Sequence, residues 1–94
     1  MGKYKLEDAH AMSIIHKKTF EIPSNDEIMA IRPGDFVKVC ASGERFWVMI
    51  EFTDFSAGKL YGRVDNDLVS TEFHGLKIGN NIEVNFHNIY AIQK

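Results

Sequence analysis

The chain has 94 residues, of which 45% are hydrophobic and 26% are charged, a composition typical of one small globular domain over residues 1–94. Its 11 basic and 13 acidic residues give a net charge of −2, which excludes a protein that attracts nucleic acid by bulk positive charge. The single cysteine, Cys40, excludes an internal disulfide, so packing alone has to stabilise the fold.

No targeting signal is recognised in the sequence. The first residues contain neither an apolar signal core nor a small-residue cleavage site. No stretch approaches the roughly 18 apolar residues of a membrane-spanning helix. We therefore expect a cytoplasmic protein that has no membrane partner.

The segment from Glu7 to Lys18 has the pattern of an amphipathic helix. Acidic residues stand in its first turn and lysines in its last, which complements the partial charges of the helix dipole. Ala11, Ile14 and Ile15 follow the i, i+3, i+4 spacing of one helix face. We expect this face to pack against an edge or a face of the following β-sheet.

A second, shorter helix is predicted after Pro23. Ser24 is followed three residues later by Glu27, the spacing of a capping box. The helix is expected to end before Pro33, because residues that precede a proline avoid helical backbone geometry. The helical segment therefore covers about residues 7–31, and the β-sheet about residues 35–92.

After residue 35 the apolar residues recur with a period of two, which is typical of β-strands. Strands are predicted over residues 36–40, 45–52 and 59–66, followed by a last strand that places Ile82, Val84 and Phe86 toward the core. The strand over residues 45–52 is the strongest. Its core face is expected to carry Phe46, Val48, Ile50 and Phe52, and its other face Trp47, Met49 and Glu51.

The strands over residues 45–52 and 59–66 are expected to form a hairpin in one register. The predicted pairs are Phe52–Leu60, Ile50–Gly62, Val48–Val64, Phe46–Asn66, Glu51–Tyr61, Met49–Arg63 and Trp47–Asp65. A slip by one residue would mix the apolar face with the polar face, which favours this register. Gly62 inside a strand indicates a bulge, a bend or a close approach of a neighbouring group.

Helices followed by several short antiparallel strands predict an α+β fold. The sheet is expected either to be strongly bent or to form a small SH3-like barrel. The chain also resembles the YegJ-like family of uncharacterised bacterial domains, over roughly Pro23 to Ile92. The pieces that carry this resemblance are GDFVKV at 34–39, ERFWV at 44–48, GRVDND at 62–67 and GNNIEVNFHNI at 79–89.

The sequence departs from that family at three positions. Leu68 stands where the family usually has proline, Asn80 stands where it tends to have aspartate, and Asn88 separates His87 from the last isoleucine of the motif. The resemblance implies no activity, because none is assigned to the family. It supports the α+β fold.

The candidate binding residues are Trp47, Met49, Tyr61 and Arg63, with Arg45 at the end of the same hairpin. Aromatic and arginine side chains that share a sheet face form protein-binding hot spots or platforms on which bases stack. The alternative is that the N-terminal helix covers this face, so that Trp47 belongs to the core.

Charged residues gather near one end of the predicted hairpin; they are Glu44, Arg45, Asp65 and Asp67. They form either a polar recognition patch or an exposed ion pair with turn-capping carboxylates. The second interpretation is favoured, because exposed ion pairs and capping carboxylates are common in small domains.

The spacing of potential ligands and nucleophiles does not indicate a metal, a cofactor or a catalytic site. The histidines, His10, His16, His74 and His87, form no HExxH or HxH motif, and Cys40 has no partner for a CxxC motif. Cys40 falls in a predicted strand, where a small apolar side chain is its ordinary role.

Three functions are therefore compared. The first is a non-catalytic protein-binding module of the immunity, antitoxin or phage-inhibitor kind. The second is a small β-barrel that binds single-stranded nucleic acid, which the lack of a basic stripe counts against. The third is an enzyme, ranked last because no catalytic motif is found. Homodimerisation through an edge strand is compatible with each of them.

Overall fold

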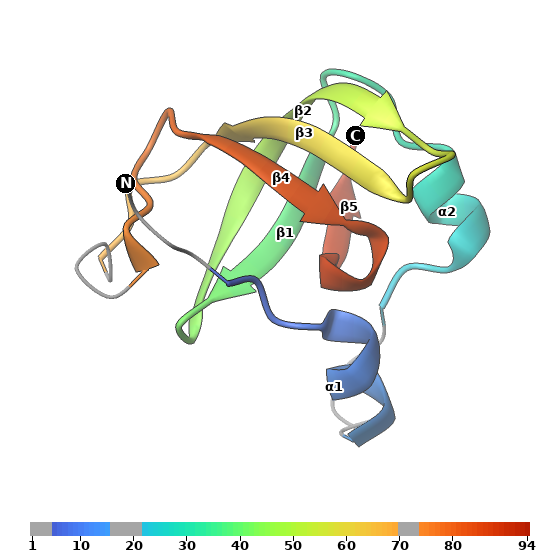
Figure 1. Ribbon diagram of the computed structural model, residues 1–94, viewed down its shortest axis with the longest axis horizontal. Coiled ribbons are helices and arrows are strands. Elements are labelled where there is room, and N and C mark those ends of the chain that lie inside the picture. Colours follow the sequence, from blue (N-terminus) through green and yellow to red (C-terminus); the bar gives the residue numbers. More distant parts are fainter. Residues whose placement is uncertain (1–4, 16–21, 70–73) are drawn as a thin grey trace.

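The period-two segments of the sequence form one antiparallel sheet in the computed structural model, which describes residues 5–15, 22–69 and 74–94. The five strands are β1 (Phe36–Ala41), β2 (Glu44–Asp54), β3 (Lys59–Val64), β4 (Asn81–Asn85) and β5 (Ala91–Gln93), in the spatial order β4-β3-β2-β1-β5 (Figure 1). The described helices are α1 (Ala9–Ile15), α2 (Asn25–Met29) and the 3-10 helix η1 (Phe86–Asn88). The α+β prediction is therefore confirmed.

The sheet is strongly bent, and it is not closed into a barrel (Figure 1). In the described part of the chain, β4 and β5 are its two edges, and no strand pairing joins them. Of the two predicted forms, the bent open sheet is the one observed. η1 provides the short connection from β4 to β5.

The inner face of the sheet forms the core, as the alternation predicted. Its buried side chains are Val37, Val39, Ala41, Phe46, Val48, Ile50, Leu60, Val64, Ile82 and Val84. α2 adds Ile28 to this cluster. The predicted capping box fixes the start of α2, since the Glu27 backbone N–H donates to Ser24 Oγ at 3.2 Å and the Ser24 N–H donates to Glu27 Oε1 at 3.0 Å.

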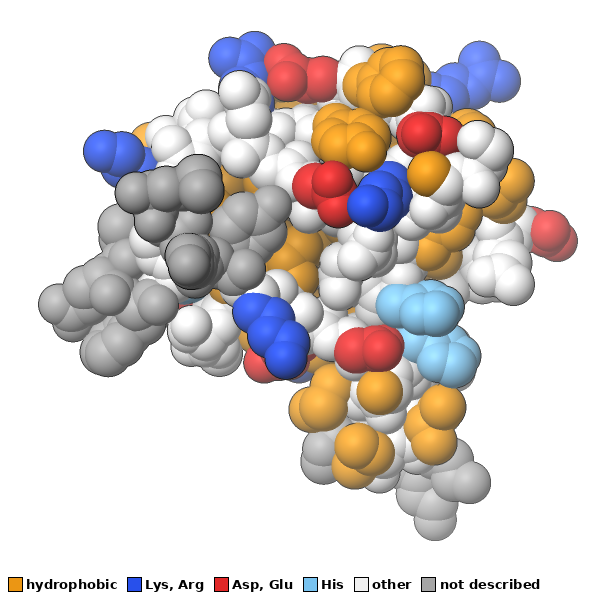
Figure 2. Space-filling view, viewed as in Figure 1, with side chains coloured by type: hydrophobic (Ala, Val, Ile, Leu, Met, Phe, Trp, Pro, Cys, Tyr) orange, Lys and Arg blue, Asp and Glu red, His pale blue; other side chains and the backbone are white. Residues whose placement is uncertain are grey.

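α1 forms where the sequence predicted a helix, but its predicted packing face is wrong. Ile14 and Ile15 are 63% and 68% exposed, whereas Ala9 is buried with Cys40 and Tyr90. Figure 2 shows apolar side chains on α1 that project away from the rest of the molecule. The predicted continuation of this helix to Lys18 lies outside the described residues.

The residues that precede α1 explain its orientation. Leu6 forms a β-bridge with Ala41, and the Glu7 backbone N–H donates to the Cys40 carbonyl oxygen at 2.8 Å. The Glu7 carbonyl oxygen in turn accepts from Asn88 Nδ2 at 3.1 Å. These contacts place α1 against η1 (Figure 1). The orientation of the helix is therefore set by the residues that precede it and not by its own apolar face.

The β2–β3 hairpin has the predicted register at three pairs, Val48–Val64, Met49–Arg63 and Ile50–Gly62, but not beyond Ile50, and the predicted pairs Trp47–Asp65 and Phe46–Asn66 are not part of the strand pairing. Ile50 pairs with Gly62 as expected, but a β-bulge follows at Glu51, so that Phe52 pairs with Tyr61 instead of Leu60. Because a bulge adds one residue to one strand, it reverses the faces beyond it. Phe52, which was predicted to lie in the core, is therefore 59% exposed.

Two predicted strands end earlier than expected. β3 ends at Val64 rather than Asn66, and the Asn66 side chain accepts a hydrogen bond from the Trp47 backbone N–H instead of continuing the ladder. β4 ends at Asn85, where Asn88 Oδ1 accepts from the Asn85 N–H at 2.8 Å and starts the turn of η1. Phe86 therefore lies in η1, half-buried, and not in the strand.

Candidate functional site

The face of β1, β2 and β3 opposite the core, called the outer face below, brings the predicted binding residues together. Trp47 and Met49 of β2 alternate with buried core residues, and Met49 lies opposite Arg63 of β3. Tyr61 follows two residues away on β3. Trp47, Met49 and Tyr61 are half-buried, and Arg63 is exposed.

Trp47 is not a core residue beneath the N-terminal helix. α1 packs on Cys40 and Tyr90 near the end of β1, whereas Trp47 contacts Lys38, whose Nζ lies 5.0 Å from the centroid of the indole ring. A cation over an aromatic face is favourable, and Trp47 is half-buried, so part of its side chain is accessible. The outer face is therefore available around Trp47.

Arg45 stands apart from the other four predicted residues. Its guanidinium lies 4.7 Å from the centroid of the Tyr90 ring, at the end of the sheet that α1 covers. The Tyr90 hydroxyl donates to Glu7 Oε1 at 2.6 Å. Arg45 is exposed, but it also contacts Tyr90, which holds residues 5–15 on the sheet.

Cys40 lies in the same cluster, and its surroundings suppress thiolate chemistry. Burial, and then the hydrogen bond and charge of Glu7, raise the pKa of the Cys40 thiol to about 11. Burial and Glu7 likewise raise the pKa of Tyr90 above its ordinary value. Because the thiolate is the nucleophile, this environment suits a structural cysteine better than a reactive one.

Phe52 is the residue of the outer surface that the sequence pattern missed. Its ring centroid lies 5.7 Å from that of Tyr61, in a tilted arrangement. Gly62 permits the local backbone path, because a Cβ atom there would lie 2.1 Å from the Met49 carbonyl oxygen. A glycine in the middle of a strand was the one signal in the sequence that pointed to this bulge.

A groove of about 430 Å³ runs beside Phe52 and Tyr61. Its lining residues are Glu51, Phe52, Tyr61, Gly62, Asn81, Ile82 and Glu83. Figure 2, which looks onto β3 and β4, shows apolar side chains on this side of the molecule with acidic and basic side chains next to them. The groove therefore combines aromatic and charged walls.

Two ion pairs border the groove. Arg63 binds Glu51 through Nε and a terminal nitrogen, both 2.9 Å from Oε2. Lys59 binds Glu83 Oε2 at 3.1 Å, and this hydrogen bond and charge raise the pKa of Lys59. Pairs as exposed as these contribute little to stability, so they can exchange partners at little cost.

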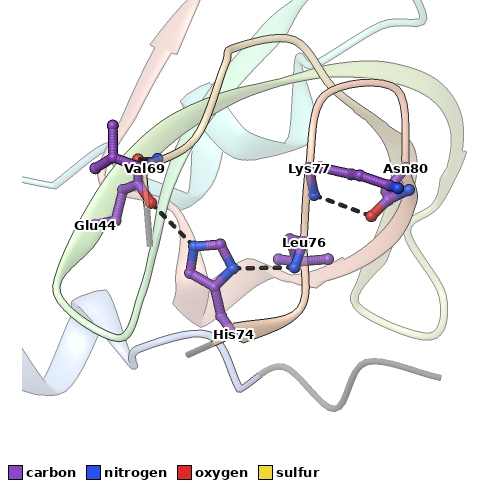
Figure 3. A network of polar contacts seen from close by, with 6 residues as sticks. All are labelled: Glu44, Val69, His74, Leu76, Lys77 and Asn80. Carbon is purple, nitrogen blue, oxygen red and sulfur yellow. Dashed lines mark hydrogen bonds and ion pairs between the residues drawn. The ribbon is translucent and has the colours of Figure 1, made fainter. Parts of the chain in front are cut away.

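The other end of β2 holds a buried polar network that the sequence did not reveal (Figure 3). His74 is 1% exposed, and its Nε2 lies 3.0 Å from Glu44 Oε1. Its Nδ1 accepts the Leu76 backbone N–H at 3.0 Å, so Nε2 carries the proton and donates to Glu44. Glu44 Oε2 also accepts the Val69 N–H at 2.8 Å.

This network corrects the interpretation of the charged cluster. The Glu44 side chain is only 13% exposed and pairs with a buried imidazole, so it is not part of an exposed ion pair. Asp65 and Asp67 are exposed as expected. Both nitrogens of the His74 ring are engaged within the fold, which gives this histidine a structural role.

The remaining histidines do not assemble a site with other ligands. His10 of α1 and His87 of η1 stack with ring centroids 5.2 Å apart, and His16 lies outside the described residues. Within residues 5–15, 22–69 and 74–94, no three histidine, cysteine or carboxylate side chains are placed to hold one metal ion. No helix in the same ranges is long and apolar enough to cross a membrane.

Comparison with known proteins yields no match to a family model, a curated protein or a solved structure. The resemblance to the YegJ-like family therefore stays a prediction from the residues that carry it. The candidate site rests on the geometry of the outer face.

Proposed function

We propose that this protein is a non-catalytic protein-binding module whose contact surface is the outer face of the β2–β3 hairpin. The observation that carries the proposal is an exposed aromatic surface: Phe52 is 59% exposed and packs on Tyr61, in a sheet whose inner face already holds the core. A single exposed apolar side chain is ordinary, but Phe52 lies against the half-buried Tyr61 on a sheet face that also carries Trp47 and Met49, and contiguous apolar patches of this kind mark interaction sites.

The composition of the outer face supports a protein partner. Trp47, Met49, Tyr61 and Arg63 belong to residue types that are enriched at protein interfaces and in their hot spots. The charges of Arg63 and Glu51 neutralise each other at a contact of 2.9 Å, which leaves no strong field of one sign at the centre of the surface. The small size and mild acidity of the chain fit an immunity-, antitoxin- or phage-inhibitor-like protein.

Single-stranded nucleic acid is the second candidate, favoured by a cation that lies over an aromatic ring. Lys38 lies over the half-buried ring of Trp47, and such a pair can combine base stacking with a phosphate contact, whereas the Tyr90 ring beneath Arg45 is buried and is not open to a base. The carboxylates of Glu51 and Asp65 on the same side oppose a phosphate backbone, so protein is the proposal that we place first.

The bent, open sheet supports the same proposal. η1 connects the edge strands β4 and β5 through a single turn, and the sheet bends so that one face surrounds the core. The opposite face then presents its side chains outward, which is the arrangement that a small binding module requires.

The test is affinity purification of the tagged protein from its source cells, with the bound proteins identified and the 260/280 nm absorbance ratio recorded. We expect a stoichiometric protein partner that is lost with Trp47→Ala and Arg63→Glu and retained with the matched control Arg32→Glu, which changes an exposed arginine ahead of β1. Circular dichroism establishes that each variant folds.

Two outcomes would overturn the proposal. Retention of the partner by both outer-face variants removes this surface from consideration. A high absorbance ratio without a protein partner, together with an affinity that falls steeply with salt, establishes the nucleic-acid alternative instead.

A further inference from the structure

The bulge at Glu51 is a device that presents an aromatic ring on the surface. Without it, Phe52 would continue the buried series of Phe46, Val48 and Ile50. The bulge turns this side chain out of the core. Bulges re-aim side chains in this way next to functional sites.

The groove beside this ring has the features of a site for a cation. Phe52 and Tyr61 provide aromatic surface, and Gly62 lines the groove between them and β4. Glu51 and Glu83 provide carboxylates on the two sides. Aromatic faces and carboxylates both attract cations, and together they favour the planar guanidinium of arginine.

The charges around the groove leave an acidic excess. The charged residues of β2, β3 and β4 around the groove include three acidic side chains, Glu51, Asp54 and Glu83, and two basic ones, Lys59 and Arg63. Both contacts of Arg63 go to Oε2 of Glu51. Glu51 thus already binds a guanidinium group of this chain, and its Oε1 takes no part in that ion pair.

We propose that the groove between Phe52 and Glu83 binds an arginine side chain from a basic segment of the protein partner. This inference deepens the function proposed above and rests on it. The guanidinium stacks on the Phe52–Tyr61 pair and hydrogen-bonds to the carboxylates of Glu51 and Glu83. Lysine fits the charge but lacks the planar surface, so it binds more weakly at this site.

The test is an NMR titration of the ¹⁵N-labelled full chain with N-acetyl-arginine amide, and with the neutral isostere N-acetyl-citrulline amide as the control ligand. We expect saturable shifts of the amide signals of Glu51, Tyr61 and Glu83 with the arginine compound. The citrulline compound leaves these signals unchanged, because it has the same shape without the charge.

Variants assign the binding to the groove. Phe52→Ala is expected to weaken arginine binding by about two- to fivefold, the loss of one cation–π contact. Glu83→Gln, which removes a charge and keeps the shape, weakens it similarly. Ile78→Ala, which trims another exposed apolar side chain (54% exposed) in a turn, leaves the affinity unchanged.

The inference is overturned if citrulline shifts the same signals equally, or if both groove variants bind arginine as the original chain does. The proposed function has a separate readout in the partner purification. A partner that is lost with Trp47→Ala, together with no arginine site, leaves the function standing without this groove. If the groove binds arginine but no protein partner is lost with the outer-face variants, the arginine site stands and the proposed protein-binding function fails.

Discussion

The two ends of β2 treat polar and apolar side chains in opposite ways. At the first residue of the strand, Glu44 is withdrawn from water and holds His74 and Val69 through hydrogen bonds of 3.0 and 2.8 Å. At the bulge, the apolar ring of Phe52 is exposed, and Glu51 is paired at the surface. One strand thus begins with a buried carboxylate and ends with an exposed aromatic ring.

This contrast separates structural residues from candidate functional residues. A buried polar group is favourable only if its hydrogen bonds are made, and no buried side-chain nitrogen or oxygen in the described ranges lacks a partner. The polar groups of Glu44 and His74 are therefore explained by the hydrogen bonds that they make within the domain. The ring of Phe52 is 59% exposed and its described ring contact is with Tyr61, so it is a candidate for the partner contact that we propose.

The largest effect is expected at the buried polar end. Glu44→Leu leaves the His74 Nε2–H and the Val69 N–H without their acceptor, which we expect to lower the free energy of unfolding by about 3–4 kcal/mol. Glu51→Leu at the other end removes only an exposed pair and changes it by about 1 kcal/mol or less. Urea denaturation measures both, and equal losses would show that the two ends do not differ.

The next effect concerns the bulge itself. Gly62→Ala puts a Cβ atom 2.1 Å from the Met49 carbonyl oxygen, so the two strands must separate, at a cost of about 3 kcal/mol. The matched control is Gly58→Ala, where no atom lies within 4 Å and only the left-handed backbone opposes the side chain, at about 1–2 kcal/mol. Thermal unfolding compares them, and a Gly62 variant no less stable than the control contradicts the close approach.

The cluster of Glu7, Cys40 and Tyr90 makes the stability of the domain depend on pH. Since burial raises the pKa of Cys40 from 9.0 to about 11, folding holds the thiol proton more tightly than the unfolded chain does. The resulting stability is complete below about pH 9 and is lost as the pH rises through about 11, and the raised pKa of Tyr90 acts in the same direction.

The same shift predicts slow thiol chemistry. At pH 8 we expect Cys40 to react with a disulfide reagent at least about tenfold more slowly in the folded protein than in urea, since the thiolate fraction falls about tenfold per pKa unit. Equal rates in the two states would place the thiol at the surface.

The smallest effect on stability is expected at the exposed ring. Phe52→Ala should change the free energy of unfolding by no more than about 0.5 kcal/mol, because the side chain is mostly in water already. Phe46→Ala, on the inner face of the same strand, is expected to cost about 3–5 kcal/mol. If Phe52→Ala destabilises the domain to a similar degree, the ring belongs to the fold and not to an interface.

Features fixed by neighbouring residues were predictable from the sequence. The capping box of Ser24 and Glu27 and the alternation of Phe46, Val48 and Ile50 depend on spacing alone, and all appear as expected. The pairing of Ile50 with Gly62 follows from the same alternation, because any slip would bury polar groups.

Features fixed by distant residues were not predictable. The alternation continues through Phe52 as if no bulge existed, and only Gly62, on another strand, opposes it. His74 looks like an isolated histidine because its partner Glu44 stands 30 residues earlier. The prediction that Ile14 and Ile15 of α1 pack against the sheet was wrong, because periodicity identifies the apolar side of a helix but not the element that this side contacts.

The hydrogen bonds of Glu7 to Asn88 and Tyr90 join residues 81 and 83 positions apart. Closing so long a loop lowers the entropy of the chain before either hydrogen bond stabilises it, and contacts of this kind slow folding. Synthesis proceeds from residue 7 toward residue 90, so the segment that carries α1 leaves the ribosome long before its binding site exists. The contacts of Glu7 with Asn88 and Tyr90 can therefore form only after nearly the whole domain has been made.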